Sequence, residues 1–196
     1  MRKVKLQMQM SLDGYVARPN GELDWMTWDQ DDKLIEFIHS LIDSSDTILL
    51  GRKMTDGFVS HWENVVNNKP DSPDFSLAKK MVDIPKIVFT KTLDKSTWNN
   101  TTLAKGNLAE EIANLKKQSR SLSGGKDLIV YGGAGFVSSL IKEGLIDEYH
   151  LFVNPTAIGN GMTIFKSLDR TQKFSVIQSK FYSCGITVLS YKPKND

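Results

Sequence analysis

The chain holds 196 residues with a formal net charge of only +2, and its acidic and basic side chains are mixed along the sequence. This length favours one domain, residues 1–196, with a full hydrophobic core, and so small a charge argues against nucleic acid as a partner. No apolar stretch approaches the roughly eighteen residues of a membrane span, and we expect no signal peptide. Cys184 is the only cysteine, so no internal disulfide can form and a cytoplasmic protein is expected.

The first half of the chain alternates between predicted strands and helices. Residues 3–11 alternate apolar and polar side chains, which is the period of a β-strand. Apolar residues at helical spacing behind an acidic first turn predict an amphipathic helix over residues 29–43. Residues 47–50 and 86–90 are short apolar runs typical of buried strands, and a helix is expected to begin just after the first of them. The polar segment 58–78, which contains two prolines, is predicted to be a loop.

The second half adds one further helix, a glycine turn and several strands. Residues 107–117 predict a helix, because Asn107 begins a capping-box pattern. After a connector over residues 119–125, which we expect to be flexible, an apolar run stops at Gly132 and Gly133, and helical spacing begins. Strands are predicted over residues 148–153, 174–181 and 185–191, the last two joined by a tight turn.

The order of the predicted elements indicates the fold class. Strands alternate with helices through residue 141, and strands alone follow. This order predicts an α/β fold with three layers, in which helices flank a mostly parallel central sheet with antiparallel C-terminal strands. Ligands of such sheets bind outside the carboxyl ends of the strands. Ser11, Gly51, Thr90 and Gly132 are the predicted ends, so we expect the loops that follow them to converge on one cleft.

Three of these strand ends carry groups that bind phosphate. Gly132 and Gly133 let a backbone approach a ligand closely, and the helix after them presents N–H groups without intrahelical partners. The other two ends add basic residues, Arg52 and Lys53 at one and Lys91 at the other. Each glycine could alone serve close packing, and each basic residue could alone be a solvated surface charge. Three such ends together predict a phosphate site.

The glycine turn does not match the dinucleotide fingerprint of a standard Rossmann fold. Gly133 and Gly135 have the spacing of its first two glycines, but Ser138 stands where the third glycine is required. The strand that follows about twenty residues later ends at Asn154 without an acidic residue for the ribose. A standard Rossmann first turn is therefore not expected.

Five short motifs occur in an order and spacing that cover nearly the whole chain. They are Ser11-Leu12-Asp13-Gly14-Tyr15-Val16-Ala17, Leu50-Gly51-Arg52-Lys53-Met54-Thr55, Val88-Phe89-Thr90-Lys91, Val130-Tyr131-Gly132-Gly133-Ala134 and Pro155-x-x-x-Gly159-x-Gly161-x-x-x-Phe165. Together they resemble the dihydrofolate-reductase-like family, in particular the reductase domain of bacterial riboflavin biosynthesis, the RibD C-terminal type. The resemblance implies a dihydrofolate-reductase-like fold for the single domain.

The resemblance also implies NADPH as the cofactor, bound along the strand ends. The residues matched to cofactor binding are Gly51, Arg52, Lys53, Met54, Thr90, Lys91, Thr92, Gly132, Gly133, Ala134, Gly135, Phe136 and Val137. In relatives, Thr90 and Lys91 would meet the adenosine 2′-phosphate, and the turn after Gly132 would cradle the pyrophosphate. The matching Gly-Gly bond of relatives is cis, so the resemblance implies a cis bond between Gly132 and Gly133.

The acid that assists hydride transfer is not marked by a single motif. Protonation makes an acceptor more electrophilic, so a carboxyl group or an ordered water beside it is expected. The resemblance implies two candidates, Asp32 in the helix after Trp25 and Asp13 in the first motif. The proline that precedes this tryptophan in true dihydrofolate reductases is absent, and Asp29 and Asp31 compete with Asp32. These aspartates could instead cap a helix or form a turn.

Two hypotheses for the function follow. The leading one is an NADPH-dependent reductase of a small heterocyclic, pterin-like or pyrimidine-like substrate, with Trp25 and Trp28 as candidate walls for a flat ring. The alternative is a non-catalytic NADPH-binding or nucleotide-binding protein on the same fold. The C-terminal edge strand favours a homodimer. His39, His61 and His150 lack metal-ligand spacing, so no metal site is predicted, and the sequence does not identify the substrate.

Overall fold

The computed structural model describes residues 1–28, 31–118 and 125–194. In this part of the chain, eight strands form one sheet. The strands are β1 (Val4–Met10), β2 (Ser45–Gly51), β3 (Lys86–Phe89), β4 (Thr101–Ala104), β5 (Asp127–Gly132), β6 (Glu148–Val153), β7 (Phe174–Phe181) and β8 (Thr187–Pro193). Their order across the sheet is β4-β3-β2-β5-β1-β6-β8-β7. The pairs among β1 to β6 are parallel, whereas β8 pairs antiparallel with β6 and β7. The predicted mostly parallel sheet with antiparallel C-terminal strands is confirmed.

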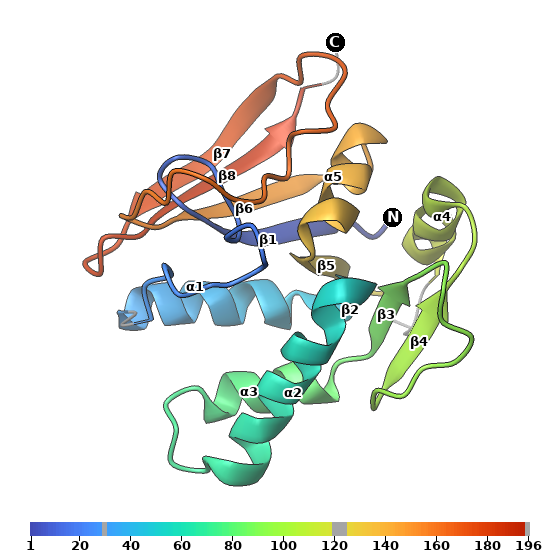
Figure 1. Ribbon diagram of the computed structural model, residues 1–196, viewed down its shortest axis with the longest axis horizontal. Coiled ribbons are helices and arrows are strands. Elements are labelled where there is room, and N and C mark those ends of the chain that lie inside the picture. Colours follow the sequence, from blue (N-terminus) through green and yellow to red (C-terminus); the bar gives the residue numbers. More distant parts are fainter. Residues whose placement is uncertain (29–30, 119–124, 195–196) are drawn as a thin grey trace.

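Helices cover both faces of the sheet. In the described part of the chain they are α1 (Asp32–Asp43), α2 (Arg52–Asn68), α3 (Phe75–Asp83), α4 (Leu108–Lys117) and α5 (Ala134–Lys142). Figure 1 shows α1, α2 and α3 below the sheet and α4 and α5 above it. Leu34 of α1 and Leu140 of α5 belong to two separate hydrophobic clusters, one on each face. The predicted three layers are confirmed, and no described helix is long and apolar enough to cross a membrane.

β1 lies in the middle of the sheet, and its alternating residues reach both layers. Leu6 packs in the cluster under α5, so Lys5 and Gln7 point to the face that α1 covers, and both are buried. The Lys5 ammonium lies 2.8 Å from a carboxylate oxygen of Asp127 and donates to the Ser44 hydroxyl at 2.9 Å. Because a buried charge is costly unless it is paired, these two contacts let the helix cover a polar strand face.

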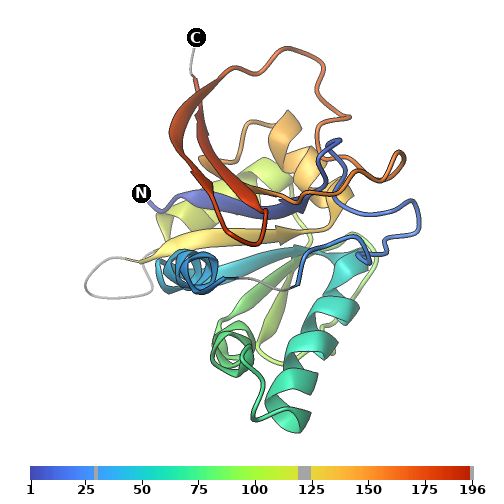
Figure 2. The same cartoon turned by 90° about the vertical axis from the view of Figure 1, so that its left-hand side faces the viewer.

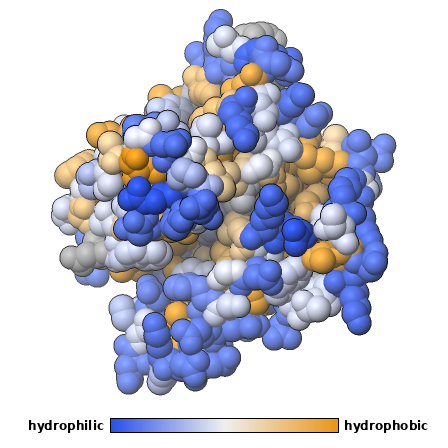
Figure 3. Space-filling model, in the orientation of Figure 1, coloured by the Kyte–Doolittle hydropathy of each residue, from blue (hydrophilic) through white to orange (hydrophobic). Residues whose placement is uncertain are grey.

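Residues 58–78 are mostly helical, so the prediction of a loop there is wrong. α2 continues to Asn68, and α3 begins at Phe75. Thr55, Val59 and Val65 are buried on α2, and Met54, Phe58 and Trp62 pack against the cluster that contains Leu34, whereas the opposite face of the helix is polar and exposed. Figure 3 shows this hydrophilic surface over α2 and α3 at the bottom of the view. Pro70 and Pro73 lie in the turn between α2 and α3 and not inside either helix, so they interrupt neither of them.

Other differences from the predicted elements are smaller. The strand β4 is not recognisable in the sequence, because it has four residues, two of them threonine, and lies at the edge of the sheet. The α1 helix begins at Asp32, because the Asp31 carboxylate caps it by accepting from the Leu34 N–H at 2.9 Å. The predicted helix start at residue 29 and most of the predicted connector over residues 119–125 lie outside the described residues.

Lowering the pH through the range from 6.5 to 4 should destabilise the protein by about 2 kcal/mol through His150 alone. His150 is buried on β6, with Nδ1 2.9 Å from the Ser190 hydroxyl, and burial lowers its pKa to about 4. The unfolded chain therefore binds this proton more tightly than the folded one. Stability is complete above pH 6.5 and is lost as the pH falls toward 4.

The His150 prediction is checked by the free energy of urea unfolding measured across this pH range. His150→Gln should flatten that part of the profile, whereas His61→Gln, on the exposed surface of α2, should leave its slope unchanged. If His150→Gln has the same slope as the wild type, His150 does not cause the loss of stability at low pH.

Candidate functional site

The carboxyl ends of five neighbouring strands form one edge of the sheet. In the spatial order β3, β2, β5, β1 and β6, these ends lie at Thr90, Gly51, Gly132, Ser11 and Asn154. Figure 2 shows the loop after β1, the start of α2 and the loop after β6 together at the right-hand end of the sheet. The loops after these strands lie at one edge of the sheet, because parallel strands place their carboxyl ends together; that they enclose one cleft stays a prediction.

Two helices start side by side at this edge, and no side chain caps either of them. Gly51 is the N-cap of α2, and Gly133 is the N-cap of α5. A β-carbon on Gly51 would lie 2.7 Å from Phe136 Cβ and 3.4 Å from the Gly133 nitrogen, so the two helix starts are in contact. The side chains of Asp31 and Asn107 cap α1 and α4 instead. The first N–H groups of α2 and α5 are thus free to bind an anion.

The turn between β5 and α5 has a trans peptide bond between Gly132 and Gly133, so the predicted cis bond is wrong. The chain turns instead at Gly132, whose φ of +141° favours glycine. A β-carbon there would lie 2.9 Å from Met54 Sδ, and one on Gly135 would have no atom within 4 Å. Gly135 thus leaves the space beside the start of α5 open, whereas at Gly132 the Met54 side chain leaves no room for a β-carbon.

Arg52 and Lys53 lie in the first turn of α2, beside the two helix starts. Both side chains are exposed, and neither forms a hydrogen bond or ion pair with another described residue. Lys91 differs, because its ammonium donates to the carbonyl oxygens of Lys105 at 2.8 Å and Gly106 at 2.6 Å. Two cations at the helix starts therefore remain free to pair with a ligand.

The loop after β3 has a fixed shape that its own side chains provide. The hydroxyl oxygen of Thr90 accepts from the N–H groups of Thr92 at 3.1 Å and Leu93 at 3.2 Å. Phe89, at the end of β3, stacks on Phe136 of α5 with ring centroids 4.7 Å apart. The structure thus brings all the predicted cofactor residues to three adjacent strand ends.

Asp13 holds two loops together on the other half of the edge. Its carboxylate accepts from the Ser11 hydroxyl at 2.6 Å and from the N–H groups of Gly159 at 2.7 Å and Ile158 at 3.1 Å. These hydrogen bonds, the one from Ser11 first, lower the pKa of Asp13. An ionised carboxylate that already accepts three hydrogen bonds suits a structural anchor better than a proton donor.

Replacing Gly161 by alanine should destabilise the protein by about 2–4 kcal/mol, because the new β-carbon would overlap the Ala17 carbonyl oxygen. The backbone around Ala17 and the backbone around Met162 form an antiparallel β-bridge. In it, the Val16 N–H donates to the Met162 oxygen and the Met162 N–H donates to the Ala17 oxygen, both at 2.8 Å. Urea unfolding measures the loss, and an unchanged midpoint would contradict this close approach. The structure thereby explains why the fifth motif requires glycine at this position.

The aspartates near the start of α1 have different environments. Besides capping the helix, Asp31 accepts from the backbone N–H and the hydroxyl of Ser183, both at 2.7 Å. The hydrogen bond from the Ser183 hydroxyl, and then that from the Leu34 N–H, lower the pKa of Asp31. Asp32 is exposed and has no hydrogen bond to another described residue, and Asp29 lies outside the described part of the chain.

Asn154 is a buried residue of this site that sequence reasoning missed. Its amide oxygen accepts from the Thr27 N–H at 2.8 Å, and its amide nitrogen donates to the Gln9 side chain at 2.8 Å and the Phe152 oxygen at 3.1 Å. It therefore joins the ends of β1 and β6 to the loop that contains Trp25 and Trp28. Its position directly after a predicted parallel strand is the signal that could have identified it.

The two tryptophans predicted to wall a flat ring differ in burial. Trp25 is buried and its indole N–H has no hydrogen-bond partner among the described residues, whereas Trp28 is 64% exposed. Within residues 1–28, 31–118 and 125–194, no three His, Cys, Asp or Glu side chains are grouped so that they could hold a metal ion.

Comparison with known protein families decides the classification. Residues 2–188 match the RibD C-terminal domain. The chain belongs to this family. Members of the RibD C-terminal domain family typically use NAD(P)H.

Relatives of this RibD C-terminal domain include proteins with and without a named role. The uncharacterized protein YyaP of Bacillus subtilis (strain 168) is 30% identical over 192 residues, which cover 97% of this chain and 94% of that protein. The riboflavin biosynthesis protein RibD of Corynebacterium ammoniagenes is 23% identical over 163 residues, which cover 82% of this chain but only 45% of that protein.

Solved structures show the same fold. A protein from Shewanella sp. PV-4, named for riboflavin biosynthesis, superposes with a TM-score of 0.72 at 25% identity over the whole of both chains. A diaminohydroxyphosphoribosylaminopyrimidine deaminase/5-amino-6-(5-phosphoribosylamino)uracil reductase from Thermotoga maritima gives a TM-score of 0.65 at 17% identity, over 98% of this chain and 57% of that one. At that identity the second similarity supports the fold alone.

Proposed function

We propose that this RibD C-terminal domain is an NADPH-dependent reductase that transfers hydride to a small heterocyclic substrate of the pterin-like or pyrimidine-like type. The observation that carries the proposal is the pair of uncapped helix starts at Gly51 and Gly133, with the free cations Arg52 and Lys53 beside them. Backbone N–H groups at helix starts and guanidinium groups are the usual partners of phosphate oxygens. A phosphate-rich dinucleotide is the ligand that fits them.

The residues at this edge fit the phosphate groups of NADPH. A β-carbon on Gly135 would meet no atom within 4 Å, so the space beside the start of α5 is open to a ligand. The starts of α2 and α5 would bind the diphosphate, and Arg52 and Lys53 would neutralise the negative charge of the diphosphate and the 2′-phosphate. The loop from Thr90 to Thr92 would add hydroxyl groups. NADPH supplies the hydride from its nicotinamide ring.

The substrate half of the edge offers one uncommitted carboxylate in the described part of the helix start. Asp13 and Asp31 already accept hydrogen bonds that lower their pKa values, so both stay ionised and serve as anchors. Asp32, in the first turn of α1, has no such hydrogen bond. We assign Asp32 as the group that delivers a proton to the substrate, directly or through an ordered water.

Asp32→Asn should lower kcat by about 100-fold and leave the NADPH dissociation constant unchanged, because it removes the proton donor and not a cofactor contact. Steady-state kinetics and a binding titration measure the two quantities. Glu36→Gln, an exposed carboxylate one turn further along α1, is the matched control and should change neither. Equal kcat in Asp32→Asn and the wild type would remove Asp32 from the mechanism.

The proposed reaction is tested by loss of NADPH absorbance in the presence of dihydropterin, pyrimidine-ribosylamine and quinone acceptors. At least one heterocyclic acceptor should oxidise NADPH faster than the control without acceptor. The alternative, a non-catalytic NADPH-binding protein, is favoured by the hydrogen bonds that occupy Asp13 and Asp31. NADPH that binds but is not oxidised by any acceptor would support this alternative.

We also propose that two copies pair through β7. This strand is one of the two edges of the sheet, and its residues Val176 and Phe181 are 64% and 71% exposed. An uncovered edge strand with apolar side chains offers backbone groups for pairing with a second chain. Light scattering should give the mass of a homodimer, and a monomeric mass at micromolar concentration would refute this pairing.

A further inference from the structure

The carboxyl edge of the sheet has two halves with opposite charge. We call the first the β2–β3 side, residues 51–56, 90–98 and 105–107. We call the second the β1–β6 side, residues 11–28, 31–34 and 154–165. The second side is one continuous surface, because Asp13 bonds to Gly159 N–H and Thr27 N–H to Asn154. A ligand in front of the strand ends would contact both sides, so their charges determine which of its parts binds where.

The β1–β6 side is acidic. Its carboxylates are Asp13, Glu22, Asp24, Asp31 and Asp32. Its only described bases are Arg18 and Lys33, and the Arg18 guanidinium is paired with Asp24 at 2.6 Å. Residues 154–165 contain no charged side chain. The nearby Lys180 lies over the Tyr182 ring, with its ammonium 4.9 Å from the ring centroid. Lys33 is exposed and has no carboxylate partner among the described residues, so this side has no free guanidinium and sets five carboxylates against two bases.

The helix start on the β1–β6 side is closed to an anion as well. The Leu34 N–H at the start of α1 donates to the Asp31 carboxylate, which also accepts from Ser183. A negative side chain thus occupies the position that a phosphate would need. The helix starts at Gly51 and Gly133 on the other half carry no such cap.

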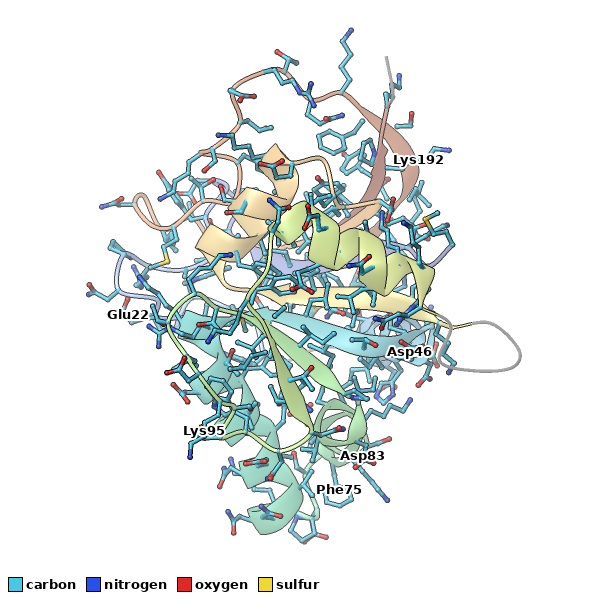
Figure 4. All side chains as sticks on the ribbon, turned by 90° about the vertical axis from the view of Figure 1, so that its right-hand side faces the viewer. Glu22, Asp46, Phe75, Asp83, Lys95 and Lys192 are labelled. Atoms are coloured by element: carbon cyan, nitrogen blue, oxygen red, sulfur yellow. The ribbon has the colours of Figure 1, made fainter. Side chains whose placement is uncertain are left out.

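The β2–β3 side is basic. Its lysines and arginine are Arg52, Lys53, Lys91, Lys95 and Lys105. Only Lys105 is paired with a carboxylate among the described residues of this side, at 2.9 Å from Asp94. Figure 4 shows Lys95 of this side and Glu22 of the acidic side at the same end of the sheet, with Asp46, at the start of β2, at the opposite end.

Apolar side chains accompany the acids on the β1–β6 side. Leu12, Leu23, Trp28 and Met162 all lie on its loops and are exposed, Leu12 at 69%. They make up half of the exposed large hydrophobic side chains among the described residues. Exposed apolar residues that gather at one place mark a binding surface.

We infer that the substrate of the β1–β6 side carries no phosphate or other anionic group and is a neutral or cationic heterocycle with apolar substituents. The inference rests on the proposed function, in which the β2–β3 side binds the phosphates of NADPH. A phosphorylated substrate would place its charge among carboxylates, without a free guanidinium and without an open helix start to bind it. By this distribution of charge, the inferred substrate of this chain differs from that of reductases that act on a phosphoribosylamino compound.

A ligand screen with the NADP⁺-saturated protein tests the inference. The library contains flat heterocycles in equal numbers of anionic, neutral and cationic members, and includes one aminopyrimidine nucleoside with and without its 5′-phosphate. Thermal shift identifies the binders, and calorimetry gives their dissociation constants. Binders should be neutral or cationic, and the unphosphorylated nucleoside should bind at least about tenfold more tightly than its phosphate. Anionic compounds that bind as often or as tightly, or a library without a single binder, would overturn the inference.

Two further arms separate this inference from the proposed function. If NADP⁺ does not bind, the proposed cofactor site is refuted, but the charge preference of the substrate is not. In that case the same screen on the free protein tests the charge preference. Asp24→Asn releases Arg18 and should raise the affinity for the 5′-phosphate about tenfold. Asp71→Asn, on the exposed loop between α2 and α3, should change nothing. Equal affinities for the 5′-phosphate in Asp24→Asn and the wild type would count against the role of the carboxylates on the β1–β6 side.

Discussion

Replacing Arg52 and Lys53 together by glutamine should weaken NADPH binding by about 100-fold and NADH binding by less than about tenfold. The two side chains are the exposed cations beside the uncapped helix starts, and neither pairs with another described residue. Their charge is therefore available to the 2′-phosphate, which NADH lacks. Calorimetric titration with each nucleotide measures both dissociation constants.

The matched control for these cations is Lys79→Gln, which removes an exposed positive charge from α3 and should leave both dissociation constants unchanged. An equal loss for NADPH and NADH would mean that Arg52 and Lys53 contact only the diphosphate. No loss for either nucleotide would contradict the cofactor site at these helix starts.

Gly51→Ala should abolish tight NADPH binding and destabilise the protein by about 2–3 kcal/mol. The new β-carbon would lie 2.7 Å from Phe136 Cβ, and Phe136 is itself fixed by its stacking on Phe89. With φ of −81°, the backbone of Gly51 imposes no strain on alanine, so the clash alone should move the start of α5 away from that of α2. The two sets of N–H groups would then no longer face one anion.

Gly57→Ala is the control for this substitution. Gly57 lies in the same helix, and a β-carbon added to it would have no atom within 4 Å, so alanine should stabilise the protein by about 0.5–1 kcal/mol. Urea unfolding with and without saturating NADPH measures stability and binding in one experiment. A Gly51→Ala protein that binds NADPH as the wild type does would refute the contact between the helix starts.

The sequence predicted the strands well because buried parallel strands are short apolar runs with glycine or polar residues at their ends. Residues 47–50 and 86–90 lie within or overlap β2 and β3, and the strand ends at Gly51 and Gly132 are where the motifs place them. The prediction failed for α2 because Pro70 and Pro73 and the polar residues near them indicate a loop, although Phe58, Val59 and Trp62 pack at helical spacing.

The sequence predicts which strand and helix ends the candidate site residues occupy, but not the hydrogen bonds that their side chains form. Spacing locates Asp13 and Asp31 beside strand and helix ends, but only coordinates reveal that Gly159 and Ser183 donate to them. The cis bond expected at Gly132 came from the family alone, and a backbone turn at +141° takes its place here. A motif fixes which residues are present, whereas the conformation of a turn depends on neighbours such as Met54.

Titration of the wild-type protein with NADPH and with NADH tests the central claim most directly. Saturable binding of NADPH, at least about tenfold tighter than that of NADH, is the predicted result, and at 100 times its dissociation constant NADPH should stabilise the fold by about 2.7 kcal/mol. Absence of binding by both nucleotides, or equal affinity for the two, would contradict the claim that this edge of the sheet binds NADPH.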